Sequence, residues 1–222
     1  MKNSANNFFY RFLRYFVQFY FFFKYKIKML NRENLPKLRG GYIIACNHQR
    51  YTDPPAIAAS VKGVFSFMAK EELFHKNPFF TLIIRLCGAF PVVRGAKDNS
   101  AIERAVSDLK KGKVFVIFPE GTRSKDGKIG RAKTGVALIA STANVPVLPV
   151  CIMYGLGGKK KNIDIAVGGI IPAQELRIDG EKGRGEFKRV SERIIGGIKD
   201  LQRQILTERG MSADDFYKVV SE

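Results

Sequence analysis

Hydrophobic and polar positions along the chain follow two periods, which predict two kinds of secondary structure. Short, nearly continuous apolar runs between turn residues predict strands that are covered on both faces of a sheet. We expect such strands at residues 42–46, 64–68, 89–93, 114–118, 147–153 and 163–167. Stretches with an apolar residue at every third or fourth position predict helices. We expect these at residues 54–61, 77–86, 100–110, 132–143 and 185–207.

The alternation of these strands and helices predicts an α/β fold, in which a mostly parallel central sheet is flanked by helices. In such sheets, ligands bind where the carboxyl ends of the strands meet. The length of 222 residues suits one domain with a short appendage. We therefore expect an α/β domain at residues 37–222 and a separate helical segment at residues 1–36.

The N-terminal segment carries aromatic residues at helical spacing. They are Phe8, Phe12, Phe16, Tyr20 and Phe23. This spacing predicts an amphipathic helix over residues 8–30, with Arg11, Arg14 and Gln18 on another face. Such a helix, followed by Lys24, Lys26 and Lys28, is typical of contact with an anionic membrane surface. The alternative is a helix that packs on the domain through its aromatic side chains.

The chain has no apolar stretch of the roughly 20 residues that a membrane-spanning helix needs. Its cysteines, Cys46, Cys87 and Cys151, lie among apolar residues and lack the close paired spacings of a zinc site. They predict free thiols, a reducing compartment and no metal. We therefore expect a peripheral or monotopic protein at the cytoplasmic face of the cell membrane.

Charge narrows the class of partner. The net charge of +18 indicates a polyanionic partner, which can be a nucleic acid, anionic lipid headgroups or a phosphorylated small molecule. With 45% hydrophobic residues, the chain has enough apolar material to bury a core, so wholesale disorder is excluded.

The first candidate for chemistry follows the first expected strand of the domain. His48 lies on a strand-to-helix turn, and Asp53 follows five residues later. A carboxylate at that distance can bind one imidazole nitrogen and fix the tautomer, which leaves the other nitrogen free to take a proton. This spacing also arises by chance, and Asp53 could instead be the N-cap of the following helix.

Two further strand ends carry residues suited to phosphate. After the strand at residues 114–118, Gly121 allows close approach of the backbone and Arg123 offers a fork of donors. After the strand at residues 89–93, Arg94 enters another loop. Either arginine alone is more often a solvated charge than a ligand.

Together these segments resemble the glycerolipid acyltransferase family, which includes the bacterial 1-acylglycerol-3-phosphate acyltransferases. The resemblance covers roughly residues 31–152 in four blocks that follow the family's order. They are the His-x4-Asp motif at His48 and Asp53, Phe-Pro-Val-Val-Arg at 90–94, Phe-Pro-Glu-Gly-Thr-Arg-Ser at 118–124 and Val-Pro-Val-Leu-Pro-Val at 145–150. Two departures, Arg50 where a serine is common and Val93 where a polar residue is common, bear on acceptor preference.

The resemblance implies acyl transfer from acyl-CoA or acyl carrier protein to the sn-2 hydroxyl of a lysophosphatidic acid, which gives phosphatidic acid in phospholipid biosynthesis. His48 would be the general base and Asp53 its orienting partner. The thioester is a co-substrate, and no other cofactor is expected. The residues expected to bind the acceptor are Arg94, Glu120, Gly121, Thr122 and Arg123. Glu120 would accept from a hydroxyl or hold an arginine.

Alternative functions remain at this stage. Within the same chemistry, the acceptor could be a lyso-ornithine lipid or glycerol 3-phosphate. In another class, a pI near 10.0 is the usual mark of a nucleic-acid-binding protein. We expect no nucleic-acid partner, because no binding motif of that kind occurs in the sequence. Cys46 beside His48 also raises the possibility of a thiol nucleophile, but the end of an apolar strand favours inert packing.

Overall fold

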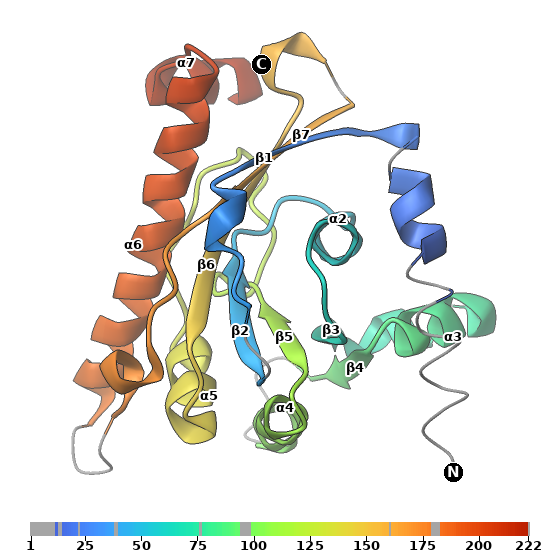
Figure 1. Ribbon diagram of the computed structural model, residues 1–222, viewed down its shortest axis with the longest axis vertical. Coiled ribbons are helices and arrows are strands. Elements are labelled where there is room, and N and C mark those ends of the chain that lie inside the picture. Colours follow the sequence, from blue (N-terminus) through green and yellow to red (C-terminus); the bar gives the residue numbers. More distant parts are fainter. Residues whose placement is uncertain are drawn as a thin grey trace.

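A seven-stranded sheet forms the centre of the described part of the chain in a computed structural model (Figure 1), in the order β1-β7-β6-β2-β5-β3-β4. The structure describes residues 12, 15–21, 23–37, 40–75, 77–93, 99–159, 161–178 and 183–221. The strands are β1 (Lys26–Leu30), β2 (Tyr42–Cys46), β3 (Phe65–Lys70), β4 (Ala89–Val92), β5 (Val114–Ile117), β6 (Val147–Tyr154) and β7 (Asn162–Val167). Neighbouring strands are parallel except β6 and β7. The predicted α/β class with a mostly parallel sheet is confirmed.

Helices cover both faces of this sheet. They are α2 (Asp53–Ser60), α3 (Pro78–Leu86), α4 (Ser100–Lys110), α5 (Gly135–Ala143), α6 (Arg184–Glu208) and α7 (Ala213–Ser221). Short 3-10 turns lie at η1 (Arg32–Asn34), η2 (Glu71–Phe74), η3 (Leu156–Gly158) and η4 (Ala173–Leu176). One apolar cluster joins the sheet to α4, α5 and α6, and a second joins its other face to α2. The sequence did not predict α7.

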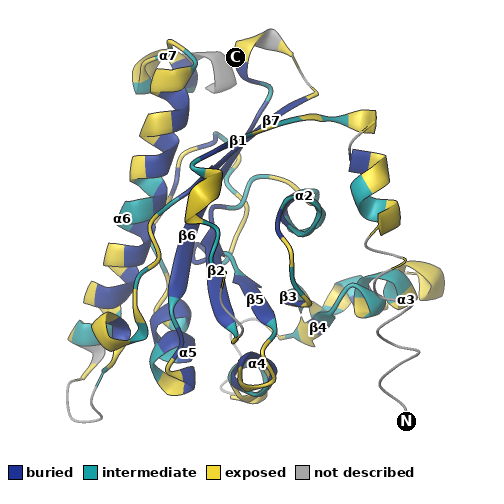
Figure 2. Cartoon of the chain, viewed as in Figure 1, coloured by how far each residue is buried: buried dark blue, intermediate teal, exposed yellow. Residues whose placement is uncertain are grey.

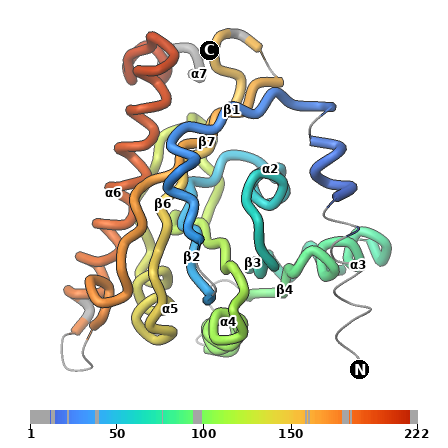
Figure 3. The backbone as a smooth tube through the Cα atoms, viewed as in Figure 1, coloured from blue at the N-terminus to red at the C-terminus, as the bar shows by residue number. Residues whose placement is uncertain are grey.

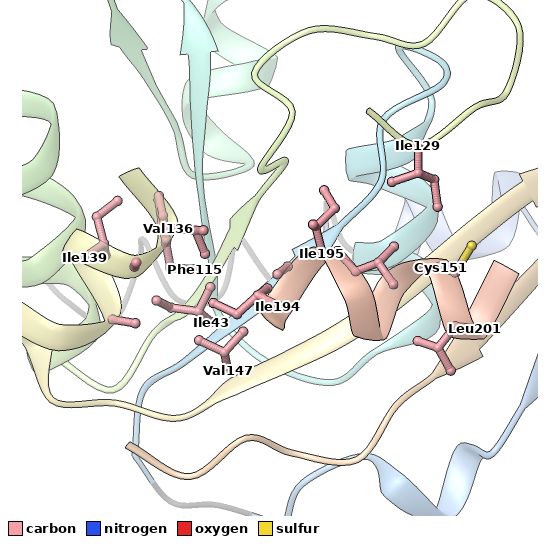
Figure 4. Close-up of a cluster of buried hydrophobic side chains, with 14 of the residues drawn as sticks. Ile43, Phe115, Ile129, Val136, Ile139, Val147, Cys151, Ile194, Ile195 and Leu201 are labelled. Atoms are coloured by element: carbon pink, nitrogen blue, oxygen red, sulfur yellow. The ribbon is translucent and has the colours of Figure 1, made fainter. Parts of the chain in front are cut away.

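Strands β2 and β6 are buried along their whole length, as Figure 2 shows in dark blue. Figure 4 shows Ile43, Phe115 and Val147 among side chains of α5 and α6, including Ile139 and Ile194. Burying an aliphatic or aromatic side chain of this size stabilises the fold by about 1.5–3 kcal/mol. The continuous apolar runs of the sequence are therefore the inner strands of a covered sheet.

The expected N-terminal helix ends earlier than predicted. Helical geometry reaches Lys24, Tyr25 follows, and Lys26–Leu30 forms β1, which pairs in parallel with β7. The prediction of helix through residue 30 is therefore wrong. In β1 every second residue faces the domain, which is the period of a strand at a sheet edge. Although β1 lies within the segment 1–36, it belongs to the sheet.

The helical residues before β1 have one face packed and one face exposed. Phe21 is buried in the second apolar cluster, and the Gln18 amide donates to the Ala59 carbonyl oxygen on α2 at 3.1 Å. Phe16, Phe19 and Phe23 on the other face are more than 60% exposed. Phe8, Arg11 and Arg14 lie outside the described residues. The tube view shows this helix and α3 on the same side of the molecule (Figure 3).

Candidate active site

The turn between β2 and α2 brings His48 and Asp53 into contact. The distance from Nδ1 of His48 to Oδ2 of Asp53 is 2.7 Å. An ionised carboxylate can only accept, so Nδ1 carries the proton and Nε2 is left as an acceptor. The turn predicted from the His-x4-Asp spacing therefore places a candidate base beside its orienting partner.

The Asp53 carboxylate is completely buried and is held by several donors. Besides His48, Oδ2 accepts from the backbone N–H of Gln49 at 2.6 Å and of Arg50 at 2.9 Å. Oδ1 accepts from the Tyr154 hydroxyl at 2.7 Å. These hydrogen bonds offset the large cost of burying a charge. Asp53 is the first residue of α2 and its side chain turns back to the loop, so it does not act as an N-cap.

The His48 ring lies between the carboxylate and a large cavity. Its face stacks on the Phe118 ring, with 4.1 Å between the centroids and 19° between the planes. The side chain is 15% exposed and forms part of the cavity wall. Packing on one face and a hydrogen bond at Nδ1 fix the ring, while the cavity gives a substrate access to it.

Glu120 joins the loop after β5 to the histidine turn. Its Oε1 accepts from the backbone N–H of His48 at 3.0 Å, and its Oε2 accepts from that of Gly130 at 2.9 Å. The N–H of Ser124 donates to the His48 carbonyl oxygen at 2.7 Å. Both oxygens of this buried carboxylate accept from backbone N–H groups, and the expected contact with a substrate hydroxyl or an arginine stays a prediction. Glu120 therefore positions the two loops.

The same hydrogen bonds bear on the stabilisation of an oxyanion. An oxyanion formed beside His48 would need N–H donors, and the backbone N–H groups of His48 and Gly121 lie in the two loops of the site. In the structure the His48 N–H donates to Glu120, and the Gly121 N–H donates to the Phe118 carbonyl oxygen at 2.9 Å. Both groups hold the loops together and are not turned toward an incoming oxygen.

Gly121 and Lys133 meet at the basic side of the cavity. Gly121 has φ of +70°, and a Cβ placed there would come within 2.9 Å of the Lys133 side chain. Both residues belong to the cavity wall. Sequence reasoning missed Lys133, because it is one of 38 Lys and Arg residues and lies outside the blocks of the resemblance. Lys133 reaches the site only in the folded chain, where its N–H donates to the Pro119 carbonyl oxygen at 2.8 Å.

Of the two arginines predicted to bind phosphate, the structure describes Arg123. The Arg123 guanidinium lies 3.7 Å from the centroid of the Tyr51 ring, and its Nη2 donates to the Tyr51 hydroxyl at 3.0 Å. Arg123 and Thr122 are exposed and belong to the cavity wall. Arg94 lies outside the described residues, so its role stays a prediction.

The cavity has a volume of about 1410 Å³, well above the roughly 300–1,000 Å³ of a pocket for a drug-sized ligand. The side formed by residues of β3, η2 and α3 is mainly apolar, with Phe67, Met68, Leu73, Phe80, Ile83 and Ile84, and it includes Lys70 at the end of β3. The side formed by the chain after β5 is basic and includes Arg123, Lys125 and Lys133. Val17 of the N-terminal helix also contributes to the wall. These two sides suit a large amphipathic ligand with an anionic group.

Cys46 has the properties of packing rather than of a nucleophile. It is fully buried at the end of β2, and burial, reinforced by the charge of Asp53, raises the pKa of its thiol well above the usual value. A neutral, enclosed thiol is a poor nucleophile. Among the described residues, no group of three His, Cys, Asp or Glu side chains is arranged to hold a metal ion.

Comparison with known proteins identifies the family. A protein-family model described as Acyltransferase matches residues 26–153. The chain belongs to this acyltransferase family. The matched range begins at β1, includes both loops of the His48 site and reaches into β6. The resemblance derived from the sequence blocks is confirmed.

Individual relatives are named 1-acyl-sn-glycerol-3-phosphate acyltransferases. The chain is 32% identical over 177 residues to the 1-acyl-sn-glycerol-3-phosphate acyltransferase of Streptococcus pneumoniae, covering 73% of this chain and 65% of that protein. It is 32% identical over 135 residues to the Bacillus subtilis protein of that name, covering 60% and 66%. The chain thus spans just under two thirds of either relative. The crystal structure of PlsC, the 1-acyl-sn-glycerophosphate acyltransferase of Thermotoga maritima, aligns with a TM-score of 0.68, 29% identity and coverage of 91% and 83%.

Proposed function

We propose that this chain transfers a fatty acyl group from a thioester to the sn-2 hydroxyl of 1-acylglycerol 3-phosphate, giving phosphatidic acid. The observation that carries the proposal is His48, held by Asp53, in the wall of a cavity that is mainly apolar on one side and basic on the other. Membership of the acyltransferase family and the names of its relatives support the same reaction.

The proposed reaction uses His48 as a general base. Nε2 removes the proton of the acceptor hydroxyl as its oxygen attacks the thioester carbonyl carbon, and Asp53 stabilises the resulting imidazolium. The tetrahedral intermediate then breaks its C–S bond, and the departing thiolate takes the proton from His48. A positioned base of this kind contributes about 10²–10⁴-fold to the rate. The acyl group moves directly between the substrates, so no enzyme nucleophile takes part.

In this proposal the two sides of the cavity hold two parts of the acceptor. Arg123, Lys125 and Lys133 bind the phosphate, and the Gly121 backbone allows it to approach closely. Thr122 is beside them in the wall, and Arg94 remains an expected phosphate ligand. The apolar wall of β3 and α3 takes the acyl chain.

Acyl-CoA and acyl carrier protein are both proposed donors, and a direct assay separates them. Purified protein is incubated with each donor and with 1-acylglycerol 3-phosphate, glycerol 3-phosphate or a lyso-ornithine lipid as acceptor. We expect acyl transfer to 1-acylglycerol 3-phosphate to be the fastest. Faster transfer to another acceptor would overturn the substrate, and no transfer with any donor would overturn the activity. Binding of nucleic acid at physiological salt would favour the rival class.

We further propose that the protein works at the cytoplasmic face of the membrane, on an anionic lipid surface. Among the described residues, no helix is both long and apolar enough to cross a bilayer. Two adjacent elements nevertheless expose large apolar side chains. Phe16, Phe19 and Phe23 project from the N-terminal helix, and Phe79 and Leu82 from α3 are 72% and 54% exposed. Both elements contribute to the wall of the same cavity, so a membrane contact there would bring lipid to its mouth.

Flotation with liposomes tests this proposal. We expect the full chain to float with anionic liposomes, and high salt to weaken the binding without abolishing it, because apolar and charged contacts both contribute. A variant that lacks residues 1–24 begins at Tyr25, keeps β1 and should remain in solution. Flotation of that variant, or failure of the full chain to float, would overturn the role of the helix.

A further inference from the structure

Tyr154 brings a third side chain to the His48–Asp53 pair, from a distant part of the chain. It is the last residue of β6, the neighbour of β2 in the sheet, and it is 7% exposed. Its hydroxyl donates to Oδ1 of Asp53 at 2.7 Å and accepts from Oγ1 of Thr52 at 3.2 Å. The hydroxyl thus belongs to a chain of hydrogen bonds from Thr52 through Tyr154 and Asp53 to His48.

The two oxygens of Asp53 have unequal surroundings. Oδ2 binds Nδ1 of His48 and the N–H groups of Gln49 and Arg50. Within the described part of the chain, the hydrogen bond at Oδ1 comes from Tyr154 alone. Because the carboxylate is completely buried, no solvent replaces this donor if it is removed.

The Tyr154 ring is held in place, and its hydroxyl keeps its proton. The Arg50 guanidinium lies over the ring, 4.5 Å from its centroid, in a cation–π contact. Burial, together with the charge of Asp53, raises the pKa of the Tyr154 hydroxyl well above its usual value. The phenol therefore remains a hydrogen-bond donor at any pH at which the protein works.

We propose that Tyr154 is a positioning residue, which holds the Asp53 carboxylate in line with His48 and withdraws part of its negative charge from the ring. This inference rests on the proposed function and adds a component that neither the motif nor the family resemblance assigns. Without the phenol donor, more of the carboxylate charge acts on His48, so the protonated ring is favoured. A base that holds its proton more tightly works only at higher pH.

The test is the Tyr154→Phe variant, which keeps the buried ring and removes the hydroxyl. We expect the pH at which the His48 ring titrates, followed by NMR in the free protein, to rise by about half to one unit. The acidic limb of the kcat/KM profile should move in the same direction, so that activity falls about threefold to tenfold below it. Thr52→Val, which removes the donor to Tyr154, should give a smaller shift of the same sign.

The controls separate this effect from loss of structure. Tyr42→Phe removes a hydroxyl from another buried tyrosine, at the opposite end of β2 from His48, and should change neither profile. His75 is exposed and should titrate identically in every variant, as an internal reference. The other ionisable groups around His48 are unchanged by the substitutions, namely Cys46 on β2, Arg50, Glu120, Arg123, Lys125 and Lys133.

The NMR readout keeps the two proposals apart. If a folded Tyr154→Phe protein shows an unchanged or lowered titration of His48, the positioning role is overturned, whether or not the protein transfers acyl groups. If His48 shifts upward as expected while no acceptor is acylated by the unmodified protein, the positioning role stands and the proposed function is overturned.

Discussion

Two regions of the site, the His48 end with Asp53 and the basic end with Arg123, differ in how firmly their side chains are held. At the His48 end, Asp53 is fully buried and accepts four hydrogen bonds, and Glu120 fixes the backbone of both loops. At the basic end, Arg123 is exposed and its contacts are to Tyr51, which is itself 69% exposed. One end is set before a ligand arrives, whereas the other can adapt to it.

This difference matches the different physical tasks of the two ends. A proton transfer requires atoms in one geometry, and a misplacement of about 1 Å can cost about 10²-fold in rate. A phosphate is recognised by charge and by several interchangeable donors, so binding tolerates movement of the side chains. Changes at the rigid end should therefore affect turnover, and changes at the basic end should affect affinity.

The largest effect should follow from removing the base. His48→Ala should lower kcat by at least about 10²-fold with little change in thermal stability, because His48 is the base held in place by Asp53 and open to the cavity. Steady-state kinetics and a melting curve measure both quantities. His75→Ala, at an exposed site directly after η2, is the matched control and should leave kcat unchanged. Near-normal turnover of folded His48→Ala protein would refute the assignment.

Glu120→Gln should affect turnover and stability together. The amide replaces one acceptor oxygen with a donor, which then faces the N–H group of either His48 or Gly130. We expect a loss of about 1–3 kcal/mol in the free energy of unfolding and a fall of about tenfold in kcat. Glu103→Gln, on the exposed side of α4, is the control. If only the KM for the acceptor rose, Glu120 would touch the substrate after all.

Arg123→Ala should separate affinity from turnover. A charge-assisted contact to phosphate contributes about 1.5–3 kcal/mol, so the KM for the acceptor should rise about tenfold to 100-fold while kcat changes little. Arg203→Ala, in an exposed ion pair with Asp200 on α6, provides a matched loss of charge. A rise in the KM for the thioester alone would assign Arg123 to the donor instead.

The smallest effect should come from the exposed face of α3. Phe79→Ser should weaken binding to liposomes about fivefold, because partial burial of one phenyl ring in lipid contributes about 1 kcal/mol, and kcat with a detergent-dispersed acceptor should not change. Val64→Ser removes another exposed apolar side chain, beside β3, and should leave binding unaltered. Equal losses in both variants would mean that α3 has no special place at the membrane.

The sequence predicts the inner parts of the fold better than its edges. Residues 42–46 form a continuous apolar run and are strand β2 without any difference in bounds. Residues 26–30 read Lys-Ile-Lys-Met-Leu and follow an aromatic helix, so the pattern of the helix continues into them. Their strand state depends on β7, which lies more than 130 residues further along the chain. Edge strands are half exposed, and their periodicity is correspondingly weak.

In the candidate site, too, the sequence predicts the local contacts better than the long-range ones. The contact between His48 and Asp53 is local, and the motif is enough to predict it. The contact between Tyr154 and Asp53 joins residues 101 positions apart, and nothing near Tyr154 in the sequence indicates a polar role. Glu120 was predicted to be in the site, but its partners are backbone groups that only the folded loops bring to it.

Tyr25, between the N-terminal helix and β1, limits how the molecule can move if that helix lies in the membrane. One residue spans about 3.5 Å, so the helix is connected directly to the sheet and not through a flexible linker. Gln18 and Phe21 brace it further against the second apolar cluster. The catalytic centre would then stay at one height above the bilayer, and the lipid acceptor would reach it by lateral diffusion in a single leaflet. Encounter with the acceptor would become a two-dimensional search, governed by its surface density rather than by bulk concentration.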